Sequence, residues 1–504
     1  MIPITTFAGQ IVAVFGLGRS GKSTAKALLA GGGEVYAWDD NAALREALSG
    51  EGIPLVDLAN ADWSQIAALV LAPGAPLTHP KPHWTVELAT AANVPVLGDI
   101  ELFFLERHRL AGKNGCQDDA AQVIAITGTN GKSTTTALIA HVLEVAGLDV
   151  QMGGNIGVPI LELEPPEPGS KPRSNSDSKT GCVYVIEMSS YQIDLTPSLQ
   201  PDIGVLLNLS PDHLDRHGSM ANYFAIKARL VEASGHAIVG VDDEGSREIA
   251  HSLSRKGASC LPISGGEIDW GCFVTDHTVR LRETPAGELC ELASIAGSAT
   301  LRGRHNAQNA AATAAVAFRL GLSMDDLIKG LGSFPGLEHR MEEIGRVGRI
   351  LFVNDSKATN ADSAEKALES FSGGIFWIAG GLAKEGGIAE LAAQFGRIEK
   401  AYLVGEAADN FAKTLEGHVA FVMSGSVECA VAQATADAKL SDARQPVVLL
   451  SPACASFDQF RSFEARGDAF RACVAGLDGV EMRNSGVIPG VTGGLTRDVA
   501  EGAA

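Results

Sequence analysis

The sequence predicts an α/β protein of three domains. Its 504 residues are enough for roughly three domains of ordinary size. Two glycine-rich stretches, near residues 16 and 128, each follow a short apolar run and precede a helical pattern. After residue 337, apolar runs alternate with helical stretches, which is typical of a parallel sheet covered by helices.

The composition narrows the class of partner. The net charge is −20 and the pI is about 5.0, which disfavours nucleic acid and anionic membranes as partners. No apolar stretch is long enough to cross a bilayer, the first residues lack a signal-peptide pattern, and the eight cysteines lack zinc-site spacing. We expect a soluble, cytoplasmic monomer with reduced thiols.

The first domain, residues 1–97, is predicted to be Rossmann-like. An apolar run, Ile11–Phe15, precedes GLGRSG at residues 16–21, and a second run, Glu34–Trp38, ends in Asp39. The G-x-G-x-x-G spacing, with an acidic residue about 20 positions later, is the fingerprint of dinucleotide-binding folds. It supports a nucleotide or nucleotide-sugar diphosphate at the first turn, without implying hydride transfer.

The central domain, residues 98–335, is predicted to be P-loop ATPase-like with a mostly parallel sheet. Residues 123–126 have the pattern of a buried strand, residues 128–133 form the loop GTNGKS, and apolar residues at helical spacing continue to Gly147. Such a loop directs backbone N–H groups at one concave spot that suits a phosphate chain. Lys132 adds a mobile positive charge and the Ser133 hydroxyl suits Mg²⁺, so we expect ATP to bind here.

A second match competes with this assignment. The strict P-loop pattern of Gly, four residues and Gly-Lys-Ser fits residues 16–23, whereas Ile126 replaces the first glycine of the central loop. We interpret Lys22 as an ordinary solvated helix residue, because motif matches often mislead. The choice between the two loops therefore depends on context.

The third domain, residues 336–483, is predicted to be a Rossmann-like, doubly wound parallel sheet. Strands are expected at residues 350–353, 375–379, 401–404, 419–422 and 447–450. Ligands of such sheets bind beyond the C-terminal strand ends, where Asp355 and Lys357 stand. We also expect a mobile loop at residues 165–181, a hinge near Pro335 that allows domain closure, and a disordered tail at residues 484–504.

Single residues at strand ends leave two interpretations open. Glu187, after a strand at residues 182–186, either binds Mg²⁺ or caps a helix. His213, after a strand at residues 203–209, is either a metal ligand or a helix-start residue, and Lys227 has the pattern of a solvated residue in a helix at 224–233. Four further residues suit either nucleotide binding or a packing or turn role: Asn306, Asn309, Asp355 and Lys357.

Six motifs together resemble one family. They are TGTNGKST at 127–134, EMSSYQ at 187–192, DHLDRH at 212–217, GRHNAQNAAA at 303–312, EHRME at 338–342 and NDSKATN at 354–360. These stretches look like those of the Mur ligase family, whose P-loop departs from the strict pattern in the same way. The resemblance covers nearly the whole chain and favours the central loop for ATP. LGDIELF at 97–103, SPACASFDQF at 451–460 and FEARGDAF at 463–470 are similar to the member that adds D-glutamate.

The resemblance implies an ATP-dependent ligase that joins D-glutamate to UDP-N-acetylmuramoyl-L-alanine (UDP-MurNAc-L-Ala) through an acyl phosphate, with ATP and Mg²⁺ as cofactors, in peptidoglycan precursor synthesis. It implies catalytic roles for Lys132, Glu187, His213 and Lys227, the last matching a lysine that carries a carbamate in this family. The implied metal ligands are Ser133, Glu187, His213 and Lys227. The implied ATP-binding residues are Gly128, Thr129, Asn130, Gly131, Lys132, Ser133, Thr134, Asn306, Asn309, Arg340, Asp355 and Lys357. The implied UDP-substrate residues are Gly18, Arg19, Ser20, Asp39, Gly74 and Asn155. The implied glutamate-binding residues are Lys357, Thr359, Lys384, Ser456, Phe457 and Phe463.

Other functions remain as alternatives. A sibling ligase would add a different amino acid through the same motifs. A nicotinamide-dependent oxidoreductase built on residues 16–21 would leave the loop at residues 127–133 unexplained. A ligase that has lost activity and only binds the UDP-sugar is disfavoured, because Lys132, Glu187, His213 and Lys227 are all present.

Overall fold

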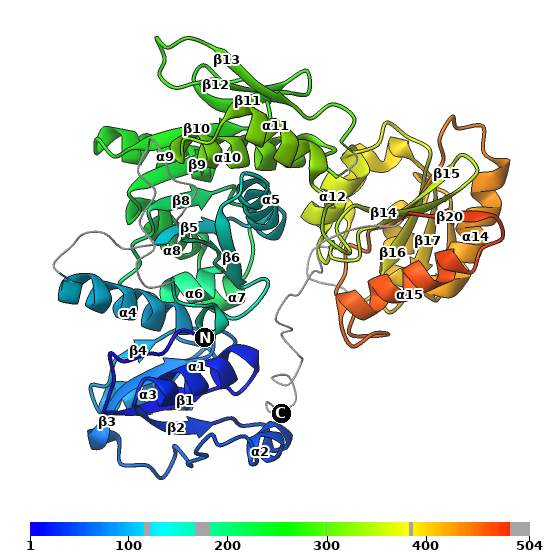
Figure 1. Ribbon diagram of the computed structural model, residues 1–504. Coiled ribbons are helices and arrows are strands. Elements are labelled where there is room, and N and C mark those ends of the chain that lie inside the picture. The colour runs from blue at the N-terminus through cyan, green and yellow to red at the C-terminus, as the bar shows by residue number, and fades with distance from the viewer. Residues whose placement is uncertain (115–120, 167–181, 299, 383–386, 484–504) are drawn as a thin grey trace. The chain divides into compact units, whose positions relative to one another are not determined.

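The computed structural model describes residues 1–114, 121–166, 182–298, 300–382 and 387–483 (Figure 1). Within this part of the chain, residues 1–294 and 308–332 form one compact unit, and residues 295–307 and 333–483 form a second. The first unit holds two sheets and the second holds one. The predicted loop at 165–181, from residue 167 on, and the predicted tail at 484–504 lie outside the described residues. No described helix is both long and apolar enough to span a membrane.

The N-terminal sheet is parallel, with strand order β2-β1-β3-β4. Its elements are β1 (Ile11–Phe15), α1 (Arg19–Ala30), β2 (Glu34–Trp38), α2 (Ala42–Leu48), β3 (Ile66–Leu71), α3 (Trp84–Ala91) and β4 (Val96–Leu97). Strand β1 lies between β2 and β3, so the chain runs from β1 to its neighbour on one side, β2, and then crosses to β3 on the other side. The loop at residues 16–21 therefore begins at the switch point, where open α/β sheets bind ligands.

The central sheet has nine strands in the order β13-β12-β11-β10-β9-β8-β5-β7-β6. Its strands and the helices around them are α4 (Asp99–Asn114), β5 (Ala121–Thr127), α5 (Lys132–Val145), β6 (Asp149–Gly154), β7 (Cys182–Glu187), α6 (Ser190–Asp194), β8 (Ile203–Leu206), α7 (Leu214–His217), α8 (Met220–Glu232), β9 (His236–Gly240), α9 (Glu244–Arg255), β10 (Cys260–Ser264), β11 (Gly271–Thr275), β12 (Thr278–Arg282), β13 (Cys290–Ser294), α10 (Arg304–Arg319) and α11 (Met324–Ser333). The pairings from β6 to β11 are parallel, and β12 and β13 add an antiparallel edge. The strand expected at residues 203–209 ends at Leu206, and the helix expected at 224–233 begins earlier, at Met220.

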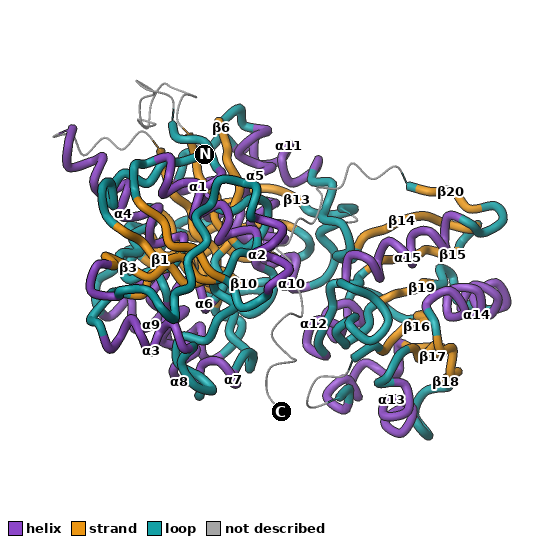
Figure 2. The backbone as a smooth tube through the Cα atoms, turned by 90° about the horizontal axis from the view of Figure 1, so that it is seen from below, coloured by secondary structure: helices purple, strands orange, loops and turns teal. Residues whose placement is uncertain are grey.

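The third sheet has the strand order β18-β17-β16-β19-β15-β14-β20. Its elements are β14 (Glu342–Val347), β15 (Ile350–Asn354), α12 (Ala361–Glu369), β16 (Ile375–Gly380), β17 (Ile398–Val404), α13 (Ala408–Leu415), β18 (Phe421–Gly425), α14 (Val427–Leu440), β19 (Val447–Leu450), α15 (Phe463–Ala475) and β20 (Val480–Met482). Helices α12 and α13 pack in one core, and α14 and α15 pack in another on the opposite face of the sheet (Figure 2). The sheet is therefore doubly wound.

Two expectations for this third sheet need correction. The sheet is not wholly parallel, because β14 and β20 pair antiparallel at one edge. Strand β18 covers Phe421–Gly425, whereas a strand was expected at residues 419–422. The apolar run that suggested the earlier start includes Val419, which is buried in the core before the strand pairing begins.

Candidate active site

The central glycine-rich loop follows β5, an interior strand of the nine-stranded sheet. Strand β5 pairs with β7 on one side and β8 on the other, and α5 begins at Lys132 directly after the loop. Gly128 and Gly131 have φ angles of 155° and 82°, which side-chain-bearing residues rarely adopt. A Cβ on Gly131 would also lie 2.8 Å from Asn309 Oδ1. The turn therefore requires glycine, and it presents a helix N-terminus of the kind that binds phosphate.

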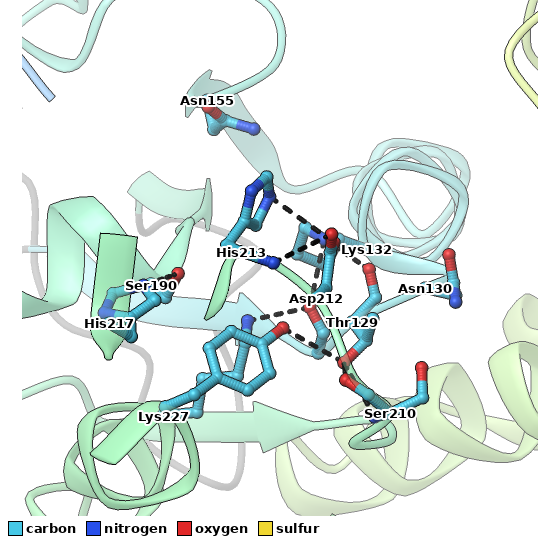
Figure 3. Close-up of polar contacts among 12 residues, drawn as sticks. Thr129, Asn130, Lys132, Asn155, Ser190, Ser210, Asp212, His213, His217 and Lys227 are labelled. Carbon is cyan, nitrogen blue, oxygen red and sulfur yellow. Dashed lines mark hydrogen bonds and ion pairs between the residues drawn. The ribbon is translucent and has the colours of Figure 1, made fainter. Parts of the chain in front are cut away.

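Two lysine amines converge on this loop (Figure 3). Lys132 Nζ donates to the carbonyl oxygens of Gly128 at 3.0 Å and Thr129 at 2.7 Å. Lys227, from α8, donates through Nζ to the same Gly128 carbonyl at 2.8 Å and to Thr127 Oγ1 at 3.1 Å. The loop is thus held by amines from two different helices.

The description of Lys227 as a solvated helix residue is wrong. The residue is only 2% exposed, because Tyr223 and the phosphate loop cover the face of α8 that carries it. Burial, with the nearby positive charge of Lys132, lowers the pKa of Lys227 well below its usual value, against the opposing charges of Asp212 and Glu187. A buried lysine of this kind is a functional-site candidate.

Glu187 stands at the end of β7 and is 1% exposed. Its Oε1 accepts a hydrogen bond from Asn155 Nδ2 at 2.7 Å, while its Oε2 is buried without a hydrogen-bond partner in the described residues. The capping interpretation is disfavoured, because Ser189 caps α6 in a capping box with Gln192. A buried carboxylate oxygen without a partner suits a cation ligand.

His213 lies at the start of α7 in the left-handed region, with φ of 53° and a side chain that is 42% exposed. Its Nε2 lies 3.4 Å from Asp212 Oδ2, and its ring centroid lies 5.0 Å from that of Tyr191. Among the described residues, no group of three or more His, Cys, Asp or Glu side chains is arranged to hold a metal ion. Mg²⁺ commonly takes one or two carboxylates and completes its coordination with phosphate oxygens and water, so Glu187 fits such a partial site.

The remaining loop residues are held by side chains that the sequence analysis did not assign. Asn208, just beyond β8, accepts a hydrogen bond from Asn130 N at 2.9 Å and donates to Asn130 O at 3.1 Å. Thr129 Oγ1 lies 3.0 Å from the Tyr223 hydroxyl. An asparagine after a strand next to β5 was the signal that could have identified Asn208.

Three predicted ATP-binding residues, Ser133, Thr134 and Asn309, lie around the first turn of α5. Ser133 is buried and Thr134 is half-buried on that turn. Asn309, on α10, is 2% exposed and accepts a hydrogen bond from Thr135 Oγ1 at 3.0 Å. Asn306, on the same helix, donates through Nδ2 to Arg302 O at 2.8 Å.

The N-terminal loop has a different geometry. Leu17 N donates to Asp39 Oδ2 at 2.6 Å, so the predicted acidic residue holds the turn itself. Gly18 is exposed, as is Arg19, where α1 begins, and Ser20 is half-buried. Lys22 lies on the surface and pairs with Glu51 at 2.5 Å, away from the loop. The strict P-loop match therefore lacks the inward lysine of the central loop.

The second unit gathers its predicted residues at the C-terminal strand ends. Asp355 is buried, and its carboxylate accepts hydrogen bonds from Ser451 Oγ at 2.9 Å and Met341 N at 3.1 Å. Burial raises the pKa of Asp355 to about 7, although these bonds and nearby Arg340 and Arg466 oppose the rise.

Five of the six predicted glutamate-binding residues are described, and all five belong to the same unit. Lys357 Nζ lies 4.1 Å from the centroid of the Phe463 ring. Ser456 is buried, Thr359 is half-buried, and Phe457 is 36% exposed. Lys384 lies outside the described residues.

Comparison with known proteins identifies the family. The Mur ligase middle domain matches residues 126–317, and the Mur ligase glutamate ligase domain matches residues 339–454. A UDP-N-acetylmuramoylalanine--D-glutamate ligase from Nitrobacter hamburgensis is 56% identical over 483 residues, which cover 95% of this chain and 99% of the relative. This chain belongs to the Mur ligase family. A ligase of the same name from Brucella abortus is 53% identical over 490 residues, covering 96% of this chain and all of the relative.

Two solved ligases share the fold. The UDP-N-acetylmuramate-alanine ligase of Thermotoga maritima superposes with a TM-score of 0.52 at 17% identity, over 92% of this chain and 98% of that one. A pseudomurein peptide ligase type C from Methanothermus fervidus gives a TM-score of 0.50 at 18% identity, over 88% and 97% of the two chains. At these identities the likeness concerns the fold alone, and it agrees with the predicted three-domain α/β architecture.

Proposed function

We propose that this Mur ligase joins D-glutamate to UDP-MurNAc-L-Ala at the expense of ATP, releasing ADP and phosphate. The observation that carries this proposal is the convergence of Lys132 and Lys227 on the loop after β5, with the buried Glu187 nearby in the same sheet. The amino acid and the acceptor are those in the names of relatives that are 53–56% identical over almost the full chain. We place the reaction in the cytoplasm, the compartment that supplies ATP.

The chemistry follows from the weakness of a carboxylate as an electrophile. The alanine carboxylate oxygen attacks the γ-phosphorus of ATP, the bond to ADP breaks, and an acyl phosphate forms. The D-glutamate amine then attacks the acyl carbon, loses a proton, and displaces phosphate to leave an amide. The protein must therefore hold three substrates in line and offset negative charge on the phosphoryl oxygens.

The loop residues suit the phosphoryl step. The backbone N–H groups after Gly128 and the start of α5 would bind the phosphate chain. Lys132 would donate to phosphate oxygens in place of the two loop carbonyls to which it now donates. Ser133, Glu187 and His213 would hold Mg²⁺, which would offset negative charge on the phosphate oxygens. Burial lowers the pKa of Lys227, which favours the neutral amine that a carbamate requires more than in an exposed lysine.

The other predicted residues complete the assignment. Gly18, Arg19, Ser20, Asp39 and Gly74 would bind the UDP portion in the N-terminal domain. Asn155 would act beside Glu187, to which it already donates a hydrogen bond. In the second unit, Asn306, Arg340 and Asp355 would contact the nucleotide. The residues for glutamate would be Lys357, Thr359, Lys384, Ser456, Phe457 and Phe463.

The test is phosphate release that depends on both UDP-MurNAc-L-Ala and D-glutamate, measured with a panel of amino acids that includes L-glutamate. Lys132→Ala should reduce kcat by at least about 100-fold, the usual effect of removing one donor that stabilises transition-state charge. Lys22→Ala is the matched control, because this lysine occupies the strict pattern yet pairs on the surface with Glu51; it should retain activity. ATP turnover that ignores D-glutamate, or greater loss with Lys22→Ala, would contradict the proposal. Turnover with a different amino acid would indicate a sibling ligase.

A further inference from the structure

Arg216, on the short helix α7, reaches from the central domain to a turn of the N-terminal domain. Its Nη1 donates to Gly74 O at 2.9 Å, and its Nη2 donates to Ala75 O at 2.9 Å and Pro73 O at 3.4 Å. The same turn includes Gly74, which the proposed function assigns to the UDP substrate. The Arg216 side chain therefore makes three hydrogen bonds to backbone carbonyls, and these bonds join the two domains of the first unit.

The guanidinium also lies over the ring of Tyr191, which is in contact with His213. The Arg216 Cζ lies 4.6 Å from the centroid of the Tyr191 ring. That ring lies 5.0 Å from the ring of His213 and stacks at 5.3 Å on the ring of His217. His217 is fixed in turn by a 2.8 Å contact between its Nε2 and Ser190 Oγ, visible in Figure 3. The turn at residues 73–75 and the segment that carries His213 are thus joined through Arg216.

The contact depends on arginine chemistry. A guanidinium is planar, donates in several fixed directions, and stacks on an aromatic face at the same time. A lysine ammonium carries the same charge but offers neither the planar fork nor the stacking surface. The close approach of the two segments is evident nearby, because a Cβ on Gly218 would lie 2.6 Å from His79 Nε2.

We propose that Arg216 is a positioning residue that fixes the substrate-binding turn at residues 73–75 against the segment of His213. The inference rests on the proposed function, since it assigns the turn to UDP-MurNAc-L-Ala. Arg216 acts through the Gly74 turn and through Tyr191, without contacting the reacting atoms. Loss of Arg216 should weaken the binding of UDP-MurNAc-L-Ala selectively.

The experiment compares Arg216→Ala and Arg216→Lys with Arg247→Ala in the full-length chain. Arg247 is a matched control, because its Nε and Nη2 also donate to a backbone carbonyl, that of Val241, in the same unit. We measure the KM of each substrate, and separately the Kd of UDP-MurNAc-L-Ala by calorimetry without ATP. Arg216→Ala should raise the KM and Kd for UDP-MurNAc-L-Ala about tenfold, the equivalent of one charge-assisted hydrogen bond, and leave the KM for ATP within about twofold. Arg216→Lys should fall between it and the wild type, and Arg247→Ala should match the wild type.

An unchanged Kd in Arg216→Ala, or an equal rise in the KM of all three substrates, would overturn the inference. If Arg216→Ala does not fold, as judged by circular dichroism, Arg216→Lys provides the same comparison. A wild-type enzyme without D-glutamate-dependent phosphate release would instead overturn the proposed function, and this inference with it.

Discussion

Asn208 holds the central phosphate loop from the strand next to it, and its replacement tests whether that loop binds ATP. Asn208→Ala removes the two hydrogen bonds to the backbone of Asn130, at 2.9 and 3.1 Å. Asn208→Asp keeps the bond from Asn130 N but turns a carboxylate oxygen toward two acceptors, Asn130 O and Gln308 Oε1. It also adds negative charge beside the proposed phosphate site.

The magnitude follows from the bonds that are lost. A neutral hydrogen bond contributes about 0.5–1.5 kcal/mol, so the pair holds the loop by about 1–3 kcal/mol. If all of this free energy were lost from nucleotide binding, the KM for ATP would rise roughly 5- to 150-fold. The backbone bond from Thr129 N to Asn208 O, at 2.9 Å, survives either substitution and keeps part of the loop in place. We therefore expect about a tenfold rise for Asn208→Ala and a larger one for Asn208→Asp.

The assay is the KM for ATP in the phosphate-release reaction, together with calorimetric binding of ADP. Asn60→Asp is the control, because it makes the same change of charge at an exposed loop where Asn60 Nδ2 donates to Asp57 Oδ2. The KM for UDP-MurNAc-L-Ala should stay unchanged in all variants. Asn208→Asp with wild-type ATP affinity, or with a selective loss of UDP-substrate affinity, would refute the assignment of the loop.

Two further predictions concern stability and pH. Glu106 accepts four hydrogen bonds from Thr5 and Thr6 at 2.7–2.8 Å, so Glu106→Gln should lower the free energy of unfolding by about 1–3 kcal/mol at pH 7. Burial would raise the pKa of Glu106, but bonds from Arg109 and the threonines hold it below its usual value, so urea unfolding should show this difference disappearing as the pH falls through that pKa. Asp355 has the opposite sign: with a folded pKa of about 7, the native state binds the proton more tightly than the unfolded chain, and stability should fall as the pH rises from about 4 to 7. Asp355→Asn should remove this slope in urea unfolding, and an unchanged slope would contradict the burial argument.

The parallel parts of the fold could be predicted because short buried strands and helical periodicity are strong local signals. The antiparallel edge of the central sheet could not. Strands β11 and β12 are joined by Asp276 and His277, which have φ angles of 49° and 58° and form a two-residue hairpin turn without the usual glycine. Strand β14 was missed because it carries charged residues. Glu343 is tied there to Arg302 at 2.7 Å and to Arg483 at 2.9 Å.

The candidate site divides in the same way. The loop around Lys132 and the strand end at Glu187 follow from local pattern, so their placement could be expected. The burial of Lys227 depends on how α8 packs beneath the loop, and the role of Arg216 depends on contact with a turn about 140 residues earlier in the chain. Such long-range contacts leave no periodic trace in the sequence. Reasoning from the residues alone therefore describes Lys227 as a solvated residue and assigns no role to Arg216.

The strand order of the third sheet has a consequence for biosynthesis. Strand β19 lies between β15 and β16, yet it ends at Leu450, about 70 residues after β16 ends at Gly380. At roughly 5–20 residues per second, a ribosome needs about 4–14 s to supply the missing strand. During that interval β15 and β16 each lack the partner on their inner edge, and open strand edges invite pairing with other chains. The nascent chain is therefore exposed to aggregation while the middle of its last sheet is still being translated.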